Sequence, residues 1–373
     1  MGEGQHLTDL SALFTPFSVN GVELPNRFVM APMTRTRSPD GVAGDDVAQY
    51  YARRARGGVG LIITEGVWID EPSASYMANV PVLGRVEQLT GLGRVADAVH
   101  EAGGRVFIQL WHAGFHRASL RLGADAAPVL SPSGLAPGGE VVGLPMTDGD
   151  IARVIDAYGR GAQEARRLGF DGVEIHGAHG YLPDQFLSAS INHRTDLYGG
   201  EEGARARFAA EVVAECRQRT APDFPIGFRL SQWKLWDYDA RIADTSRVLG
   251  ALLSPLTAAG VDVFHCSTRR HWEAAFEGST LGFAGWVKAL TGKPVITVGS
   301  VGLGEALDTP RGRPSEVPLA SLDPLLEQFS RDEFDLVAIG RALLANPDWV
   351  AKMGGGRAAD LKTFDPRVLA ELF

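Results

Sequence analysis

The chain has 373 residues, which is enough for two average domains or for one large α/β barrel. Hydrophobic residues make up 45% and charged residues 22%, so the composition is that of a globular protein and excludes a disordered one. The 45 acidic residues outnumber the 36 basic ones, and the net charge of -9 argues against nucleic acid or a membrane surface as a partner.

The first ten residues and the two cysteines bear on cellular location. Residues 1–10 carry Glu3 and Asp9 where a signal peptide would have basic and then apolar residues, and no long uncharged apolar run follows. Cys216 and Cys266 are too few and too far apart for a disulfide framework or a CxxC site. A cytoplasmic protein in a reducing compartment is therefore expected.

Eight short apolar runs follow one another along the chain, each bounded by glycine, proline or charge. They alternate little between polar and apolar residues, which is typical of parallel strands buried on both faces. The runs span residues 28–33, 59–64, 105–110, 172–176, 226–230, 261–265, 294–298 and 336–339.

Helix-type periodicity fills intervals between these strands, with apolar faces at residues 89–99, 151–168, 208–216 and 248–256. Strand followed by helix, eight times over, predicts an α/β fold in which residues 1–373 form a single (β/α)8 TIM barrel domain. A doubly wound sheet is the alternative. It would usually show a GxGxxG turn after the first strand, where this chain has Thr34-Arg35-Thr36-Arg37.

Four connections are too long to be simple turns. They are the excursions after the third, fourth, sixth and seventh strands, at residues 111–147, 179–203, 267–284 and 301–334. All four follow carboxyl ends of strands, which is the catalytic face of a barrel, so they are candidate lids and pocket walls.

Glycines and a cation follow the last two predicted strands. Gly299 and Ser300 come after residues 294–298, and Gly340 and Arg341 come after residues 336–339. Barrels most often bind a phosphate at these two connections, through backbone N–H groups and a positive charge. The pattern predicts a phosphate site; the alternative is that Arg341 is a surface arginine that caps a helix.

Two polar side chains lie at strand ends that a barrel would bury. Arg229 needs an anionic or acceptor-rich partner there, either a ligand or a structural carboxylate. The Gln109 amide offers a donor and an acceptor, which suits a heterocycle such as an isoalloxazine pyrimidine ring. With the phosphate site, they suggest a flat, phosphorylated cofactor.

Residues 176–181, His-Gly-Ala-His-Gly-Tyr, form the strongest local motif. His176 and His179 can together hold one oxyanion, at ~3 kcal/mol per bond in a transition state. Tyr181 is protonated at neutral pH, since a tyrosine has a pKa of about 10, and can act as a general acid. One alternative is a metal site, but metal hydrolase barrels add carboxylates at other strand ends, and here only Glu65 is obvious. The other is a core histidine with an incidental neighbour.

In this order and spacing the motifs resemble those of the Old Yellow Enzyme family of flavoprotein oxidoreductases, from residue 13 to about residue 349. The similar segments are residues 26–35, 109–112, 176–181 and 192–200. The resemblance implies FMN as cofactor, with contacts from Pro32, Met33, Thr34, Gln109, Arg229, Gly299, Ser300, Gly340 and Arg341. It implies that His176 and His179 bind the substrate, that Tyr181 donates a proton, and that Trp111 and Trp272 line the substrate pocket.

The chain departs from the family pattern in places that concern substrate more than class. Phe115 stands where many members have an arginine, so a contact or loop anchor from that arginine is in doubt. Residues 269–272, Arg-Arg-His-Trp, resemble a subgroup feature whose role is open. Phe364 or Phe373 is a candidate for the aromatic residue that often covers the flavin edge in this family.

The resemblance implies an ene-reductase that takes hydride from NADH or NADPH in a ping-pong reaction. An activated alkene, an α,β-unsaturated carbonyl or nitro compound, would then receive hydride at one carbon and a proton from Tyr181 at the other. The expected partners are small molecules, and the protein is a monomer or a homo-oligomer without a metal. Cys216 and Cys266 exclude relatives that carry an iron–sulfur cluster. A flavin-free aldolase or isomerase acting on a phosphorylated substrate is the alternative, with Lys234 as its one tempting lysine.

Overall fold

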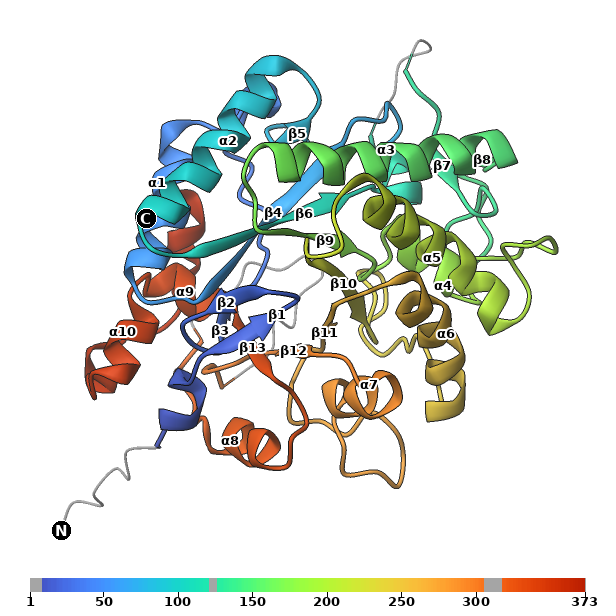
Figure 1. Cartoon of the computed structure of the whole chain (residues 1–373). Helices are drawn as coiled ribbons and strands as arrows, with labels where there is room; N and C mark the ends of the chain where they lie inside the picture. Colours follow the sequence, from blue (N-terminus) through green and yellow to red (C-terminus); the bar gives the residue numbers. More distant parts are fainter. Residues whose placement is uncertain (1–8, 121–125, 305–316, 373) are drawn as a thin grey trace.

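The computed structural model describes residues 9–120, 126–304 and 317–372, and its main sheet closes into a barrel of eight parallel strands (Figure 1). The predicted (β/α)8 barrel is confirmed, and the doubly wound alternative is wrong because β3 pairs with both β4 and β13. In order around the barrel the strands are β3 (Phe28–Met30), β4 (Leu61–Ile69), β6 (Arg105–Trp111), β9 (Gly172–His176), β10 (Ile226–Ser231), β11 (Val263–Ser267), β12 (Val295–Val298) and β13 (Leu336–Ile339).

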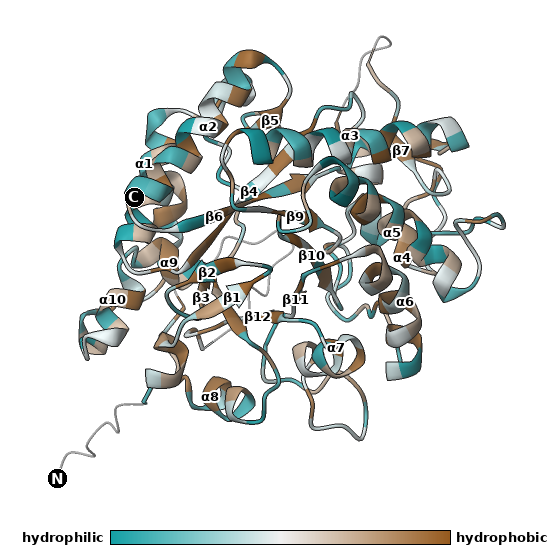
Figure 2. Ribbon diagram, viewed as in Figure 1, coloured by the Kyte–Doolittle hydropathy of each residue, from teal (hydrophilic) through white to brown (hydrophobic). Residues whose placement is uncertain are grey.

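The helices lie outside the barrel and turn apolar faces toward it, so brown strands sit inside teal-edged helices in Figure 2. The α-helices are α1 (Asp45–Arg56), α2 (Val86–Glu101), α3 (Asp148–Arg167), α4 (Leu182–Leu187), α5 (Glu202–Arg219), α6 (Ser246–Ala259), α7 (Phe283–Thr291), α8 (Asp323–Ser330), α9 (Arg341–Ala345) and α10 (Trp349–Gly354). Short 3-10 helices are η1 (Ser11–Phe14), η2 (Pro39–Gly41), η3 (Gly114–Ser119), η4 (Ala358–Asp360) and η5 (Pro366–Ala370).

A hairpin that the apolar runs did not reveal covers the amino end of the barrel. Strands β1 (Phe17–Val19) and β2 (Val22–Leu24) are antiparallel and are joined by Asn20-Gly21, both with positive φ. Val19 and Leu24 pack with side chains of the barrel interior, including Phe107. With the amino end closed, polar side chains gather at the carboxyl ends of the strands.

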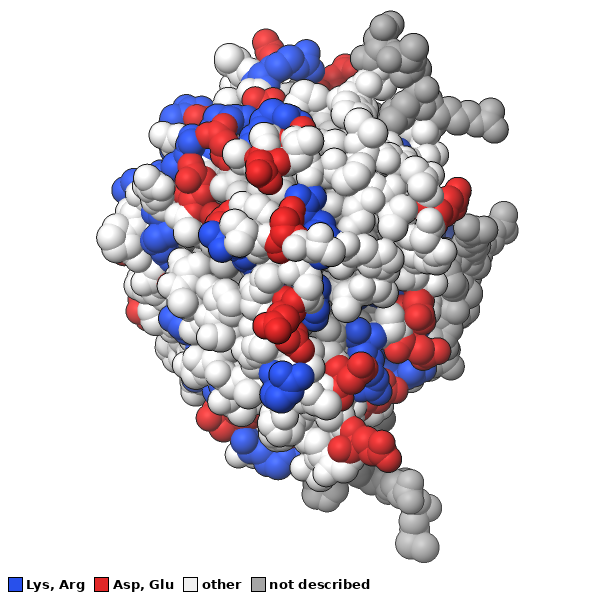
Figure 3. All heavy atoms as spheres, turned by 90° about the vertical axis from the view of Figure 1, so that its right-hand side faces the viewer, with Lys and Arg blue, Asp and Glu red and all other residues white. Residues whose placement is uncertain are grey.

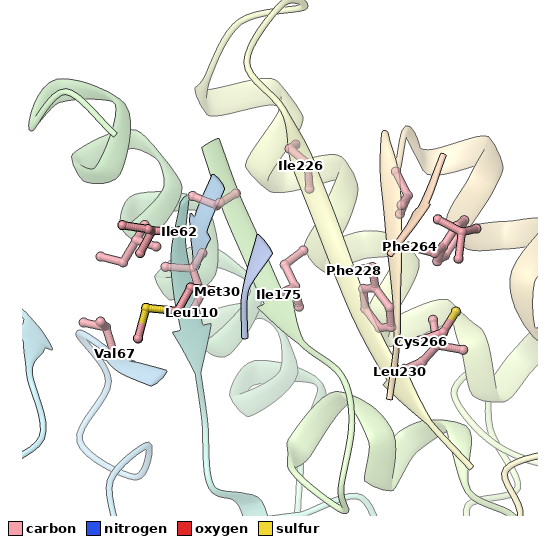
Figure 4. Close-up of a cluster of buried hydrophobic side chains, with 14 of the residues drawn as sticks. Met30, Ile62, Val67, Leu110, Ile175, Ile226, Phe228, Leu230, Phe264 and Cys266 are labelled. Carbon is pink, nitrogen blue, oxygen red and sulfur yellow. The ribbon is translucent and has the colours of Figure 1, made fainter. Parts of the chain in front are cut away.

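The layer between strands and helices is the larger apolar core. Figure 4 shows part of it, with side chains such as Ile62, Phe228 and Phe264 held between the barrel and its helices. Burial of this layer supplies most of the favourable free energy that holds the strands in place, at roughly 25 cal/mol per Å². It fixes the strand ends, and therefore the side chains described below.

The long excursions after the third, fourth, sixth and seventh strands are present, although residues 121–125 and 305–316 lie outside the described part. They contain short strands β7 (Leu130–Ser131) and β8 (Leu144–Pro145), and β5 (Val82–Leu83) extends the sheet beside β4. On the face formed by α3, α5 and α6, charges of both signs are intermixed (Figure 3). Within the described residues no helix is both long and apolar enough to span a bilayer.

Candidate active site

Strand register brings the predicted site residues together at one end of the barrel. Arg229 on β10 pairs with His176 on β9 and with His265 on β11. Gln109 on β6 pairs with Glu174 on β9. Parallel strands in a closed barrel end at the same face, so these five side chains surround one mouth.

Gln109, Glu174 and His265 form a chain of hydrogen bonds inside the barrel. The Gln109 amide nitrogen donates to Glu174 Oε1 at 2.7 Å, and Glu174 Oε2 lies 2.6 Å from His265 Nδ1. A carboxylate has no hydrogen to donate, so it fixes the amide with its nitrogen toward Glu174. Burial raises the pKa of Glu174, but His265 and Arg229 outweigh burial and hold that pKa below its ordinary value. The Gln109 carbonyl oxygen is left to accept from an N–H of a heterocycle.

Arg229 is a cation buried at the barrel mouth, with 6% of its surface exposed. Burial lowers its pKa, and the charge of Glu174 opposes that shift. Glu174 is therefore the nearby structural carboxylate that was one of the two partners expected for Arg229. Arg229 Nε is nevertheless buried without an acceptor among the described residues, which leaves a donor directed to a ligand.

His176, His179 and Tyr181 lie in contact. The ring centroids of His176 are 5.3 Å from His179 and 4.7 Å from Tyr181. His179 has a φ of 61° and is held from two sides, because its backbone N–H donates to Ser231 Oγ and its Nε2 lies 2.8 Å from Ser267 Oγ. This arrangement favours the substrate-binding pair over the isolated core histidine.

Burial, followed by the charge of Arg229, lowers the pKa of both His176 and His179 well below the ordinary value. Both rings are therefore neutral near pH 7, and each can donate one N–H. Burial, followed by Tyr76, raises the pKa of Tyr181 well above 10. Tyr181 thus keeps its proton at neutral pH, as a general acid requires.

Tyr76 is a member of this cluster that the sequence did not reveal. Its hydroxyl lies 3.0 Å from the Tyr181 hydroxyl, and both rings pack against Trp111. The loop that carries Tyr76 is anchored by Arg117, whose guanidinium donates to Ser75 O. Many family members have an arginine at position 115, where this chain has Phe115. Arg117 provides a loop anchor two residues further on.

The segment after β10 clamps the loop of residues 179–181. Trp233 stacks on His179 with centroids 4.2 Å apart, and a Cβ on Gly180 would lie 2.0 Å from the Trp236 ring. Asp184 accepts from the Gly180 N–H at 2.6 Å and from Lys234 Nζ at 2.5 Å. Lys234 is 2% exposed in this ion pair, so the alternative of a lysine-dependent aldolase loses its nucleophile.

Ser300 and Arg341 meet at the predicted phosphate site. Arg341 Nη2 lies 3.4 Å from Ser300 Oγ, and Gly340 is the N-cap residue just before α9. A Cβ on Gly299 would lie 2.5 Å from Thr268 Oγ1, so only glycine fits that turn. Phe364 lies beneath this site, with its ring 5.8 Å from the Arg341 guanidinium, and is 1% exposed. Phe373 lies outside the described residues.

The turn after β3 carries Pro32, Met33 and Thr34. Met33 Sδ is 3.6 Å from the Cβ position of Gly340, which places this turn beside the phosphate site. Glu65 holds the turn in shape by accepting from the Arg35 N–H at 2.8 Å. Glu65 was expected just after a strand at residues 59–64, but β4 continues past it to Ile69, through a register shift between Ile63 and Gly66.

We expect the Glu65→Gln variant to change how stability depends on pH. Burial raises the pKa of Glu65 from 4.5 to about 7, despite hydrogen bonds from the backbone of Arg35 and Thr36. Its contribution to stability is complete below the unfolded pKa and is lost as pH rises through about 7. Relative to the variant, the parent should lose up to about 3 kcal/mol between about pH 5 and pH 8.5 in urea unfolding. A constant difference between the two proteins would contradict the shifted pKa.

The two predicted pocket tryptophans differ in position. Trp111 is buried, stacks on Trp68 at 3.9 Å and meets Tyr181 edge-on at 4.8 Å. Trp272 is 40% exposed and packs on His271. Trp111 therefore lies beside Tyr181 and Trp272 does not, and the part of either residue in a substrate pocket stays a prediction.

The residues at the barrel mouth fit FMN. Arg229 Nε and His176 Nδ1 are buried nitrogens without partners among the described residues, and Ser300, next to the glycine-only position 299, lies beside Arg341. Gln109 offers a carbonyl acceptor at the same mouth. A buried cation, an amide acceptor and a phosphate site at one mouth are groups that suit a flavin mononucleotide.

Comparison with known proteins decides the family. Residues 12–313 match the model of the NADH:flavin oxidoreductase / NADH oxidase family. The chain belongs to this family. Membership confirms the resemblance to Old Yellow Enzyme, the predicted class of flavin oxidoreductases, and FMN with a nicotinamide reductant as cofactors.

Individual relatives show how far the similarity extends. The flavin oxidoreductase hxnT of Emericella nidulans is 33% identical over 94% of this chain and 92% of its own length. The NADH oxidase of Thermoanaerobacter brockii is 31% identical over 95% of this chain and 52% of its own length. This chain spans about half or less of the first curated relatives that it matches. Morphinone reductase in complex with tetrahydroNAD superposes with a TM-score of 0.80, at 29% identity, over 96% of this chain and 94% of that one.

Proposed function

We propose that the protein is an ene-reductase that uses NADH or NADPH to reduce the C=C bond of activated alkenes. The observation that carries the proposal is the contact of two neutral histidines with a protonated tyrosine beside the buried Arg229. FMN, when bound, supplies hydride transfer. The proposal includes a single FMN-binding barrel domain and a ping-pong order of the two half-reactions.

His176 and His179 would bind the carbonyl or nitro oxygen of the alkene. Each neutral ring has one N–H, and His179 can offer it to the substrate from Nδ1 in the tautomer whose Nε2 accepts from the Ser267 hydroxyl. As the oxygen gains negative charge, two fixed donors stabilise it by several kcal/mol without reorganisation. Tyr181 lies against His176 and would deliver the proton to carbon.

Arg229, Gln109, Ser300 and Arg341 would hold the cofactor. Arg229 favours a negative charge at the barrel mouth, since opposite charges attract strongly in a partly dry site. The negative charge of Glu174 partly balances the positive charge of Arg229 and so weakens this attraction. Cytoplasmic location is proposed as well, because both cysteines are buried free thiols.

An anaerobic substrate panel tests the proposed function. The purified protein should be yellow, should lose its visible flavin absorbance on addition of NADH or NADPH, and should regain it with enones, maleimides or nitroalkenes. A colourless protein, or one that the reduced nicotinamides do not bleach, would exclude the ene-reductase.

The Tyr76→Phe variant should alter the hydrogen bonding and the pKa of Tyr181 while leaving the Tyr181 hydroxyl in the protein. Loss of the Tyr76 hydroxyl leaves Tyr181 without its hydrogen-bond partner and lowers the pKa of Tyr181, because Tyr76 raises that pKa. We expect alkene reduction to slow by about tenfold, because the Tyr181 hydroxyl loses the hydrogen bond that positions it, while reduction of the enzyme by NADH stays unchanged. Stopped-flow measurements of both half-reactions across pH would show this, and an unchanged pH profile would place Tyr76 outside the proton path.

A further inference from the structure

A buried carboxylate, Glu71, lies at the base of the loop that carries Tyr76. The loop follows β4 and runs over residues 70–81 without a helix or a strand. Since no ladder of backbone hydrogen bonds fixes such a segment, contacts with its neighbours decide where Tyr76 lies. Glu71 is 7% exposed, and the proposed reaction gives it no role so far.

Both oxygens of the Glu71 carboxylate accept hydrogen bonds. Oε2 accepts from the Ser73 N–H at 2.6 Å and from the Ser73 hydroxyl, and Oε1 accepts from Arg153 Nε on α3 at 3.1 Å. Burial raises the pKa of Glu71, but hydrogen bonds from His112, Ser73 and Arg153 outweigh burial and lower that pKa to about 2. Glu71 is therefore a charged acceptor at neutral pH.

His112 joins this carboxylate to the segment that follows β6. Its Nδ1 accepts from the Gly114 N–H at 3.0 Å, and burial lowers its pKa, so the ring is neutral and carries its hydrogen on Nε2. Nε2 lies 3.1 Å from Ser73 Oγ and 3.5 Å from Glu71 Oε2. The base of the loop is thus held from β6 and from α3.

Two more contacts fix the loop between its base and Tyr76. The Ala113 N–H donates to Ala74 O at 2.8 Å, and the Arg117 guanidinium donates to Ser75 O. Both donors belong to the segment after β6 that also contains His112. The path of the loop up to Tyr76 is therefore set by this one segment.

His112 also holds the segment that carries Tyr181. Its backbone oxygen accepts from the Leu182 N–H at 3.1 Å, one residue after Tyr181. His112 thus supports Tyr181 through its backbone and the loop of Tyr76 through its side chain. The two tyrosine hydroxyls lie 3.0 Å apart, and an increase of more than about 0.5 Å would break their hydrogen bond.

We propose that Glu71 is a positioning residue for the proton donor, because it holds Tyr76 within hydrogen-bond distance of Tyr181. In this role Glu71 acts only through Tyr76. The inference rests on the proposed function, in which Tyr181 gives its proton to the alkene.

The Glu71→Gln variant of the holoenzyme keeps the size of the side chain but loses its charge and one acceptor. We expect oxidation of the reduced variant by an enone to slow by about tenfold, as expected for Tyr76→Phe, because the same hydrogen bond is lost. Oxidation by a quinone needs no proton at carbon, so it should stay within about twofold of the parent, as should reduction by NADH. Stopped-flow absorbance of the flavin measures all three steps.

A double variant separates positioning from general damage to the fold. If Glu71 acts through Tyr76, adding Glu71→Gln to Tyr76→Phe should change the enone rate by less than about twofold, because the hydrogen bond is already absent. A further loss of about tenfold in that background would overturn the proposal, since independent effects add. Equal slowing with enone and quinone, or an unchanged enone rate in Glu71→Gln alone, would do the same.

Arg153→Met guards against a Glu71 variant that does not fold, since the Arg153 side chain is 48% exposed. Loss of this partner should slow the enone step by about two- to fivefold, the range of an exposed ion pair, and leave the quinone step unchanged. Arg167→Met is the matched control, because Arg167 lies on the same helix, is 59% exposed and pairs with Glu164. Equal enone rates in these two variants would contradict the role of Glu71.

The parent enzyme separates this proposal from the proposed function. A parent that reduces enones retains the proposed function, whatever the Glu71 and Arg153 variants do. A parent that reduces no alkene overturns both.

Discussion

Replacement of Tyr181 by phenylalanine should slow alkene reduction by about 10²- to 10⁴-fold, which is the usual cost of losing a positioned acid. Reduction of the enzyme by NADH needs no proton from Tyr181 and should stay within a few-fold of the parent. The high pKa of Tyr181, caused first by burial, means that the parent rate should not fall near neutral pH through ionisation of this group. Rapid mixing of reduced enzyme with an enone measures the affected step.

Acceptors that need no proton at carbon provide the control for Tyr181→Phe. Quinones should oxidise the reduced variant at nearly the parent rate, because only the proton to carbon is missing. Tyr50→Phe is a matched tyrosine variant, since Tyr50 is buried on α1 and lies against Arg54 and Tyr51 instead of the histidine pair. Equal slowing with enones and quinones would show that Tyr181 is only a pocket wall.

Replacement of Arg341 by alanine should weaken FMN binding by about 10- to 100-fold, the value of a charge-assisted hydrogen bond to phosphate. The reason is its position at the start of α9, where it meets Ser300 after the seventh strand. Titration of apoprotein with FMN, followed by quenching of flavin fluorescence, gives the dissociation constant.

Arg341 also packs over the buried Phe364, so its loss could act through structure. The thermal midpoint of each apoprotein separates the two effects. Arg357→Ala, at an exposed arginine after α10, should leave the dissociation constant unchanged. If Arg341→Ala binds FMN as tightly as this control, the phosphate assignment is wrong.

The barrel could be predicted because its strands are short apolar runs with strong boundaries. β3 is three residues shorter than predicted, and β4, β6, β10 and β11 continue past their predicted ends, β4 furthest, to Ile69. The hairpin β1–β2 has no buried apolar run, because its short strands alternate in burial. Its Asn20-Gly21 turn was the available signal.

Site residues at the carboxyl ends of strands could be predicted from the sequence. Site residues on loops or inside strands could not. Gln109, His176 and Arg229 stand at such ends, and the register of β6, β9 and β10 brings them to one mouth. Tyr76 reaches Tyr181 from a loop after β4, whose path depends on tertiary contacts such as Arg117 with Ser75. Glu174 sits inside an apolar run, where one carboxylate carries no positional signal until the neighbouring strands are known.

Lys234 shows how context changes the meaning of a residue type. As a lone lysine near a strand end it was a candidate nucleophile for an aldolase. In the structure it is ion-paired with Asp184 at 2.5 Å and buried, so it positions the loop that carries His179 and Tyr181. Charge pairing between distant segments of sequence is invisible without the fold.

Transfer of deuterium from NADH to an alkene tests the proposed reaction most directly. The holoenzyme is reduced anaerobically with one equivalent of NADH deuterated at C4, the oxidised nucleotide is removed, and one equivalent of an enone is added. We expect one equivalent of saturated ketone per flavin, with the label at the β-carbon and a solvent-derived proton at the α-carbon. Recovery of unreduced enone, or product without the label at the β-carbon, would contradict a ping-pong ene-reductase.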